Sequence, residues 1–461
     1  MPARIRIKQT DFHQYFPLIR VLAIFLILLG LSLLVFHHNH SPPPRLPAPE
    51  TNPFQLLSDT SGTISKVACV VNSARRSPIR NAAATSEIVN ALPENTSVIL
   101  LTNDRDSFTL TPSPNVQLAG LRPNGAYTIW PQDPFLVLAP RSRNATSPTR
   151  LLLPAKFDRS DDLELAHTIA TLIGADTIES KLLFEGGNIV TSNSEIFIGE
   201  NTIRMTAAHL GETLSRAAQR FAFTLGKPVI VVGGFPQPIG HLDMMLTPLG
   251  DNRLVLADPA AGANLVSSIA KNDPFAITAF EEKCIAEFFG HPAINKLENP
   301  SGETIRPPTL RNQTTMALSV TRNLAPSLDT MAHFLAKKGF EVHRIPFFSA
   351  TPPPQPINPD QNATQQDERP GPTYPTLTYN NVLITKSPNE PVPSVLLPQY
   401  GLDALDQAAE RTWSKLGYSV IPVPGLHISA MYGGSLRCCA KVLRRTPSPP
   451  SSPHQGTTIS P

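Results

Sequence analysis

Cysteine and charge are both scarce in this sequence, and each scarcity excludes a class of protein. Only four cysteines occur among 461 residues, whereas small domains built on disulfides contain many more in a shorter chain. Charged residues make up 16% of the chain and the formal net charge is +3, with no stripe of Lys and Arg interleaved with aromatic residues. A disulfide scaffold is therefore excluded, and nucleic acid is not expected as a partner.

Proline, in contrast, is abundant, and its clusters divide the chain. There are 49 prolines, about twice the average usage, while hydrophobic residues at 41% are sufficient for a packed core. Composition predicts five parts: a cytoplasmic segment and membrane anchor at 1–40, a Pro-rich linker at 41–61, a globular domain at 62–445, a Pro-rich surface insertion within it at 347–376, and a disordered tail at 446–461.

The N-terminal region has the pattern of a membrane anchor. Residues 21–36 carry no charge, and residues 17–19 extend this run toward the roughly 20 apolar residues that span a bilayer. Basic residues precede the run and prolines follow it, so we expect a cytoplasmic N-terminus and an extracytoplasmic domain, whether lumenal, extracellular or periplasmic. No small-residue cleavage site follows, which favours a single-pass anchor over a cleaved signal peptide. A buried core helix is the alternative.

The globular region repeats a local pattern of a helix followed by a strand. Caps and hydrophobic periodicity predict five such units, at residues 85–92 and 97–101, 160–173 and 182–184, 214–225 and 229–232, 327–338 and 340–345, and 404–416 and 418–421. Polar motifs fall shortly after these strands, and α/β folds bind ligands at strand ends. The pattern indicates a cyclic array of β/α modules around a central site.

Four polar motifs carry the reactive side chains. They are Trp130-Pro131-Gln132-Asp133-Pro134, Phe184-Glu185-Gly186-Gly187-Asn188, His241-Leu242-Asp243, and Gly433-Gly434-Ser435-Leu436-Arg437-Cys438-Cys439. Two carboxylates can bind a planar guanidinium bidentately, and Asp133 and Asp243 are the candidates. Cys438 is the candidate nucleophile, because a thiolate attacks readily once a neighbouring cation lowers the pKa of the thiol.

Each motif alone has a simpler interpretation. An Asp before proline commonly forms a turn, two glycines allow a sharp turn or a close backbone approach, and Cys438 with the next cysteine could be two inert thiols or a strained disulfide. His241 and Asp243 would lie on one face of a strand, with Leu242 and Met244 on the other, because strand side chains alternate. The combination favours function, since several reactive residues rarely coincide by accident.

In this order, the motifs resemble those of the guanidino-group-modifying enzymes with the pentein fold. The Glu-Gly-Gly motif at 184–190 resembles that superfamily's Glu-Gly-Gly strand, and the segments 378–384, 397–401 and 433–438 resemble most the agmatine deiminase and protein-arginine deiminase branches. The resemblance covers roughly residues 65 to 445. It implies an α/β fold in which five ββαβ modules form a five-bladed propeller around a polar pocket.

The resemblance also implies how the reactive residues act. Cys438 would attack the central carbon of the guanidinium and form a covalent thiouronium intermediate. His241 would protonate the departing ammonia and then activate water, while Glu185 orients His241. Paired acid–base and nucleophilic roles of this kind need no metal and no cofactor.

A second group of residues is expected to bind the substrate, which would be a small-molecule guanidine or an arginine side chain. The resemblance implies that Asp133 and Asp243 hold the guanidinium. Trp130 could form a cation shelf or belong to the core, and the amide of Asn188 could bind backbone or ligand. Arg437 could lower the pKa of the nearby thiol or bind a substrate carboxylate.

Three positions depart from the family pattern and leave the substrate open. Gln132 stands where arginine is usual, Arg437 where histidine is frequent, and Ser435 interrupts a run of glycines. The expected reaction is hydrolysis of a guanidino C–N bond, with release of ammonia, on an agmatine-like compound or on free or peptidyl arginine. The alternatives are an amidinotransferase of the same fold, a catalytically silent protein that binds arginine-like ligands or a protein partner, and a structural surface protein.

Overall fold

The structure, a computed structural model, describes residues 52–72, 81–104, 114–142, 148–234, 236–289, 313–350, 374–387, 390 and 392–447. The expected membrane anchor, most of the Pro-rich insertion and the tail beyond residue 447 lie outside these ranges. Within the ranges, no helix combines the length and the apolar character that a membrane span requires. The anchor and its orientation therefore stay predictions.

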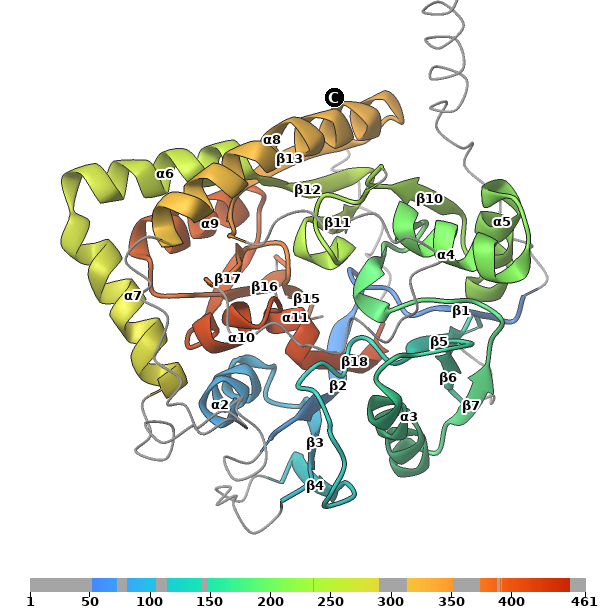
Figure 1. The fold of residues 1–461 in the computed structure, drawn as a ribbon. Coiled ribbons are helices and arrows are strands. Elements are labelled where there is room, and N and C mark those ends of the chain that lie inside the picture. The colour runs from blue at the N-terminus through green and yellow to red at the C-terminus, as the bar shows by residue number, and fades with distance from the viewer. Residues whose placement is uncertain are drawn as a thin grey trace, which may run out of the picture. The chain divides into compact units, whose positions relative to one another are not determined.

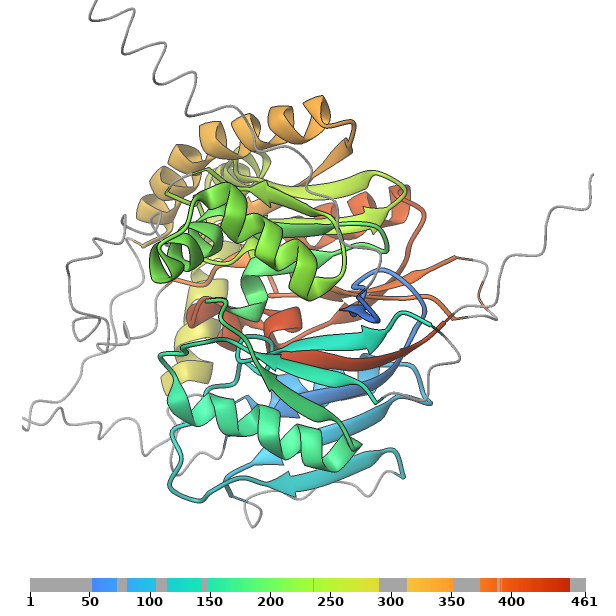
Figure 2. The same ribbon diagram turned by 90° about the vertical axis from the view of Figure 1, so that its right-hand side faces the viewer.

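The described residues form five small sheets, each built on the same ββαβ unit. Two strands pair antiparallel, and the second continues through one or more helices into a third strand parallel to it. Figure 1 shows the sheets around a common centre, with α3 (Ser160–Ile173), α5 (Leu214–Leu225), α6 (Pro259–Asn272) and α8 (Gln313–Lys337) on the periphery. Figure 2 shows the same arrangement from the side.

The first three units lie mainly in the N-terminal half of the chain. The first consists of β18 (Ala440–Thr446), β2 (Thr63–Val70), α2 (Ala82–Ala91) and β3 (Ser97–Thr102), with β4 (Val116–Gly120) at its edge. The second consists of β5 (Leu136–Pro140), β6 (Arg150–Leu153), α3 and β7 (Asp176–Glu179), with β1 (Phe54–Leu56) at its edge. The third consists of β8 (Ile189–Thr191), β9 (Ile196–Gly199), α4 (Glu200–Leu210), α5 and β10 (Val229–Val232).

The fourth and fifth units complete the set. The fourth consists of β11 (Leu246–Gly250), β12 (Arg253–Asp258), α6, α7 (Pro274–Phe289), α8 and β13 (Glu341–Phe348), with β14 (Leu377–Thr378) at its edge. The fifth consists of β15 (Leu383–Thr385), β16 (Ser394–Pro398), α9 (Asp403–Lys415) and β17 (Ser419–Val423). Two short helices, α10 (His427–Met431) and α11 (Leu436–Cys439), follow the fifth unit. Because β18 pairs antiparallel with β2, the last strand of the chain completes the first unit and joins the two ends of the repeat.

Four of the five predicted helix–strand units are confirmed, with bounds within a few residues except at α8, which begins at Gln313 and not at residue 327. One strand was predicted wrongly. After α3 the parallel strand is β7, Asp176–Glu179, and not residues 182–184. The sequence Asp-Thr-Ile-Glu is polar because β7 is an edge strand. Leu182 and Phe184 are apolar because they are buried beside β5 and β6 without joining the sheet.

Two expected boundaries also differ from the structure. Residues 54–56 lie in the predicted linker, but they form β1, which pairs with β5. Phe54 and Leu56 lie on the same face of this strand, and both are buried. Strand β13 runs to Phe348 and so enters the first two residues of the range expected for the surface insertion. The polar segment that follows β1 contributes to the site described below.

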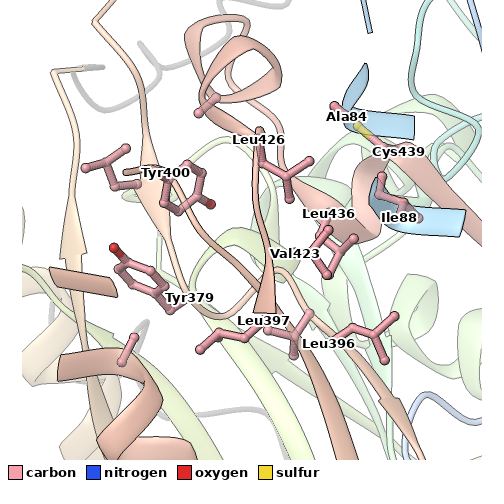
Figure 3. Packing of buried hydrophobic residues seen from close by; sticks show 14 of the residues in the cluster. Ala84, Ile88, Tyr379, Leu396, Leu397, Tyr400, Val423, Leu426, Leu436 and Cys439 are labelled. Carbon is pink, nitrogen blue, oxygen red and sulfur yellow. The ribbon is translucent and has the colours of Figure 1, made fainter. Parts of the chain in front are cut away.

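A continuous apolar core supports the C-terminal strands and the segment that carries the reactive cysteine. Figure 3 shows Leu436 and Cys439 of α11 among the buried side chains of this core, close to Ala84 and Ile88 of α2. In the same core the rings of Tyr379 and Tyr400 meet edge to face with centroids 5.5 Å apart. Helix α11 is therefore anchored by its apolar side, which leaves its polar side for the site.

Candidate active site

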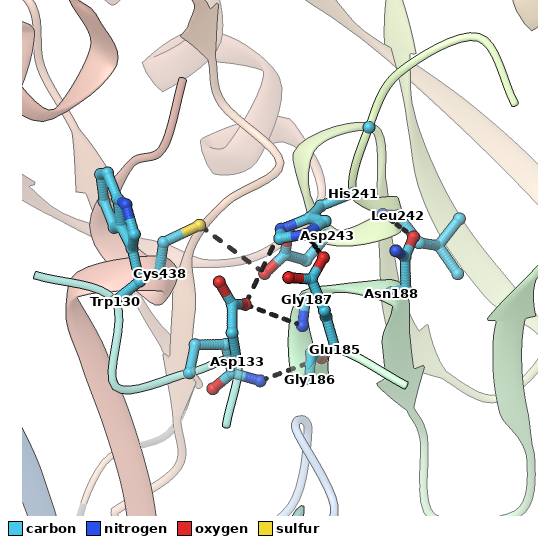
Figure 4. Close-up of polar contacts among 12 residues, drawn as sticks. Trp130, Asp133, Glu185, Gly186, Gly187, Asn188, His241, Leu242, Asp243 and Cys438 are labelled. Atoms are coloured by element: carbon cyan, nitrogen blue, oxygen red, sulfur yellow. Dashed lines mark hydrogen bonds and ion pairs between the residues drawn. The ribbon is translucent and has the colours of Figure 1, made fainter. Parts of the chain in front are cut away.

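The site is built from one loop of each ββαβ unit, and each loop lies directly before the first strand of that unit. Asp133 precedes β5, Glu185 precedes β8, His241 and Asp243 precede β11, Asn381 precedes β15, and Cys438 precedes β18. Figure 4 shows that the labelled members of this set converge, although they lie far apart in the sequence. The fivefold repeat thus places five equivalent loops at one end of the strands.

His241 and Asp243 do not lie on a strand, which corrects the prediction. The backbone of His241 is extended (φ −113°, ψ 142°) and begins a single 3₁₀ turn, Leu242–Met244, and Glu185 stands in the same way (φ −115°, ψ 139°) before Gly186–Asn188. Leu242 and Met244 are buried, so the apolar positions alternate with the polar ones as they would on a strand. The prediction that Leu242 and Met244 are buried is confirmed, but Asp243 and Met245 are buried as well, so this segment is not a half-buried strand.

The two glycines after Glu185 allow neighbouring loops to approach very closely. A Cβ on Gly186 would lie 2.0 Å from the carbonyl oxygen of Gln132, and a Cβ on Gly187 would lie 2.5 Å from Nδ1 of His241. No side chain fits at either position without displacing the loop opposite. The close backbone approach that the Gly-Gly motif suggested is therefore present, and it brings three loops together.

His241 and Glu185 form an ion pair at the partly exposed side of the cluster. Nε2 of His241 lies 2.6 Å from Oε2 of Glu185, and Nδ1 lies 3.7 Å from Oδ1 of Asp133. Burial opposes the charge on His241, but Asp133 and Glu185 outweigh burial and raise its pKa well above the usual value. Burial likewise opposes ionisation of Glu185, but His241 and Arg159 lower its pKa to about 2. The two carboxylates therefore favour the protonated form of the imidazole.

The thiol of Cys438 faces this polar cluster. Its Sγ lies 3.9 Å from Oδ2 of Asp243 and 3.3 Å from Nδ2 of Asn381. Burial and the charge of Asp243 raise its pKa to about 11, against the opposing effect of His241. The four cysteines are free and Cys439 lies in the apolar core, so the adjacent thiols form no disulfide and only one of them reaches the polar cluster.

Both carboxylates expected to bind a guanidinium already pair with an arginine of the chain. Arg159, which directly precedes α3, donates from its Nη2 to Oδ2 of Asp133 at 2.8 Å and to Oε1 of Glu185 at 3.3 Å. Its Nε lies 3.5 Å from Oδ2 of Asp162. The side chain of Arg159 is 22% exposed, so it pairs with Asp133 from the solvent side.

Arg437 pairs with the other carboxylate from the buried side. Its Nη1 donates to Oδ2 of Asp243 at 2.7 Å, and its Nη2 donates to both carboxylate oxygens of Asp59 at 3.2 Å. Asp243 Oδ1 has no hydrogen-bond partner among the described residues. Arg437 therefore holds Asp243 from behind, where we had expected it to act on the thiol or on a substrate carboxylate.

The remaining predicted binding residues support the loops. Oδ1 of Asn188 accepts a hydrogen bond from the backbone N–H of Leu242 at 3.2 Å, so Asn188 ties the Glu185 loop to the His241 loop. The ring of Trp130 lies against Gly434, where a Cβ would come within 2.4 Å of it, and beside Cys438 in Figure 4. Both side chains border the site through contacts with protein.

Sequence reasoning missed three residues that complete the site. Arg159 directly precedes the predicted helix at 160–173 and carried no signal of its own, and Asp59 occurs in a segment expected to be linker. Asn381 lies in the segment 378–384 that resembles the pentein enzymes, but nothing in the sequence distinguished it from Asn380. That family segment was the one available signal.

A metal ion was not predicted, and the cluster does contain a possible set of ligands. One ligand atom from each of Asp133, Glu185 and His241 lies within 4.8 Å of the others. Arg159 already binds both carboxylates and the raised pKa of His241 keeps a proton on its ring. A metal would have to displace an arginine and a proton, and metal-independence stays a prediction.

A pocket adjoins the cluster at Arg437. It is lined by Asp59, Gln132, Arg437 and Lys441 together with apolar residues from β1, β5, β8, β15 and β18. Nζ of Lys441 donates to the carbonyl oxygens of Gln132 at 3.1 Å and Phe135 at 2.6 Å. Burial, with the charge of Arg437, lowers the pKa of Lys441 to about 7. Cys438, His241 and Asp243 do not line this pocket, so it is separate from the reactive cluster.

Comparison with known proteins identifies the fold. No protein-family model and no curated protein matches the sequence, but solved structures match the coordinates. The agmatine deiminase of C. jejuni has a TM-score of 0.51 and 13% identity, with 86% of this chain and 97% of that chain covered. The agmatine deiminase of Enterococcus faecalis has a TM-score of 0.50 and 13% identity, with 84% and 95% covered.

A third structure, of a protein provisionally called a peptidyl-arginine deiminase, has a TM-score of 0.51 and 13% identity, with 85% of this chain and 98% of that chain covered. The fold is that of the pentein deiminases. At this level of identity the likeness establishes the α/β fold predicted from the sequence and does not extend to activity or substrate.

Proposed function

We propose that the chain is a hydrolase that cleaves a guanidino C–N bond and releases ammonia. The observation that carries this proposal is the convergence of a thiol, a paired imidazolium and two carboxylates from four of the five units. Cys438 supplies the thiol, His241 with Glu185 the acid–base pair, and Asp133 with Asp243 the anionic walls. Such a set suits a planar cation with an electrophilic carbon.

Substrate binding would use the acceptors that the structure leaves available. Oδ1 of Asp243 is buried without a hydrogen bond from any described residue, and an unpaired buried acceptor favours a donor from a ligand. Oδ2 of Asp133 is occupied by Arg159, so a substrate guanidinium would replace that arginine there. The arriving cation also lowers the pKa of Cys438, which Asp243 and burial otherwise hold high.

The chemical steps follow from these positions. When the substrate cation binds, the thiol of Cys438 loses its proton to solvent. The thiolate then forms a bond to the guanidinium carbon, and His241 gives its proton to an amino group, which leaves as ammonia as the C–N bond breaks. The resulting thiouronium is attacked by water, from which His241 takes a proton. The C–S bond then breaks, the thiolate is regenerated, the remaining proton of the attacking water passes to solvent, and a neutral ureido product leaves. Glu185 stabilises the imidazolium, which donates its proton in the first half of the cycle and is formed again in the second.

A second function is favoured by a specific observation. Because Arg159 and Arg437 already neutralise the two carboxylates and the thiol is protonated at neutral pH, a catalytically silent protein that binds arginine-like ligands has the same site. The printed names of the similar structures, agmatine deiminase and peptidyl-arginine deiminase, indicate the ligands to test first for both functions.

The test compares two neighbouring thiols. The full-length chain is incubated with agmatine, free arginine and an arginine-containing peptide, and ammonia and ureido product are measured. Cys438→Ala should abolish product formation, whereas Cys439→Ala should retain it because Cys439 faces the apolar core. Addition of an amine acceptor distinguishes hydrolysis from amidino transfer, since transfer yields a new guanidine and no ammonia.

Equal product formation by the Cys438→Ala variant and the unchanged chain would contradict the catalytic role. Binding of a guanidine without product in the unchanged chain would support the silent binding protein.

A further inference from the structure

Asn381 occupies, in the fifth unit, the loop position that the reactive residues occupy in the other four. Its side chain is fully buried and touches two other units. Oδ1 accepts a hydrogen bond from the backbone N–H of Cys438 at 3.1 Å, and Nδ2 donates to Sγ of Cys438 at 3.3 Å and to the carbonyl oxygen of Asp243 at 3.4 Å. A single amide thus links the nucleophile loop to the loop of the second carboxylate.

The orientation of this amide is fixed by its partners. A backbone N–H can only donate, so the atom facing Cys438 N must be the oxygen of the amide. The carbonyl oxygen of Asp243 can only accept, so the atom facing it must be the nitrogen. The N–H group that points at the sulfur is therefore a consequence of two other contacts, and the opposite orientation would break both.

We propose that Asn381 is a positioning residue that fixes the rotamer of Cys438 and stabilises its thiolate by an N–H···S hydrogen bond. This inference rests on the proposed function, in which Cys438 is the nucleophile. The groups that face the sulfur are Asp243 and Asp133, which disfavour the thiolate, and His241, which favours it. A neutral donor adds stabilisation to the thiolate without adding a positive charge that would repel a guanidinium.

The neighbouring Asn380 provides a matched control. Asn380 is also buried, but its Nδ2 donates to Val255 O at 2.9 Å and Thr247 Oγ1 at 3.3 Å, on the fourth unit and away from the sulfur. Replacement of either residue by Asp keeps the shape and introduces the same charge. The two variants therefore differ in whether the changed atom faces Cys438.

The experiment measures alkylation of Cys438 by iodoacetamide in the full-length chain from neutral to alkaline pH, with fragment mapping by mass spectrometry to distinguish it from Cys439. Asn381→Asp should slow alkylation at neutral pH by about tenfold or more and move the pH profile to higher pH, because a donor to a charged sulfur is replaced by an acceptor. Asn381→Ala should have the same direction and a smaller size. Asn380→Asp should stay within about twofold of the unchanged chain.

Unfolding of each variant is followed alongside, so that loss of fold is distinguished from a change at the sulfur. A folded Asn381→Asp variant with an unchanged alkylation profile would overturn the inference, and so would an equal shift in Asn380→Asp. The readout does not need turnover. If the unchanged chain shows the Asn381-dependent profile but forms no ureido product, the proposed hydrolysis fails and the positioning role stands.

Discussion

The two carboxylates of the site differ in how their arginines reach them. Arg159 pairs with Asp133 from a loop at the solvent side, and its side chain is 22% exposed. Arg437 pairs with Asp243 from the position directly before Cys438, and its side chain is 9% exposed. Arg437 also reaches Asp59 on the segment between β1 and β2, so this pair connects three separate parts of the chain.

The difference separates an exchangeable half of the site from a fixed one. A partly exposed arginine can be replaced at a buried carboxylate by an incoming cation, because the carboxylate then keeps a compensating charge, whereas removal of Arg437 without a replacement leaves two carboxylates uncompensated. A ligand cation can therefore compete at Asp133, while Asp243 keeps its partner and offers its second oxygen.

The largest expected effect comes from breaking the buried pair. Arg437→Met should lower the free energy of unfolding by about 3–5 kcal/mol, because Asp243 would stay buried without a cation and Asp59, whose side chain is 26% exposed, would lose the same partner. Urea unfolding measures the change. The control is Arg204→Met on α4, whose ion pair with Glu200 is 40% exposed on the arginine side and should contribute less than about 1 kcal/mol.

A loss equal to that of the Arg204 control would show that Arg437 does not fix Asp243, and the fixed half of the comparison would be wrong. Partial recovery of stability in a double variant that also carries Asp59→Asn would strengthen it, because the second change removes one of the stranded charges.

The next effect concerns the exchangeable half. Arg159→Gln should tighten the binding of a small guanidine by about tenfold, because one competing cation at Asp133 is removed. Binding is measured by calorimetry with Cys438→Ala present to prevent turnover. Arg122→Gln is the matched control, since Arg122 pairs with Asp161 and Glu164 of α3 and makes no contact with Asp133 that the structure records.

Weaker binding in Arg159→Gln would reverse the interpretation. Arg159 would then be part of the surface that receives the ligand, for example as the partner of an anionic group, and Asp133 would not be exchanged. An unchanged affinity would show that the guanidine uses Asp243 alone.

The sequence predicted the repeat because each unit carries its own signal. Helix caps and apolar periodicity are local, and they placed α2, α5, α8 and α9 before strands of the correct sheets. Strand β7 was missed because an edge strand needs few apolar residues. The join between β18 and β2 could not be predicted from local pattern, since the two strands lie at opposite ends of the described chain.

The reactive residues were predictable by type, and their partners were not. A cysteine after glycines or a His-x-Asp motif carries chemistry that any reader of the sequence can recognise. Asp59 meets Arg437 across 378 positions, and Asn381 meets Cys438 across 57. Such contacts depend on how five units close on one another, and residue type gives no indication of them.

The smallest expected effect concerns the ion pair between His241 and Glu185. His241 has a folded-state pKa raised by Asp133 and Glu185, so its charge contributes stability that is fully present below its ordinary pKa and is lost as pH rises through the raised value. Glu185→Gln removes one of the two anions and should lower the pKa of His241, which moves that loss to lower pH. The effect on unfolding should stay below about 1 kcal/mol, because the side chain of Glu185 is 41% exposed and solvent screens it.

An NMR titration of the His241 ring measures this shift directly. Glu185 itself has a pKa lowered to about 2, so its own contribution is present at neutral pH and is lost only as the pH falls toward that value. The alkaline side of the titration therefore reports on His241 and on the neighbouring thiol of Cys438, and not on Glu185. An unchanged pKa of His241 in Glu185→Gln would mean that Asp133 alone stabilises the imidazolium. His241 would then depend on the exchangeable half of the site, and displacement of Arg159 from Asp133 would alter the pKa of His241.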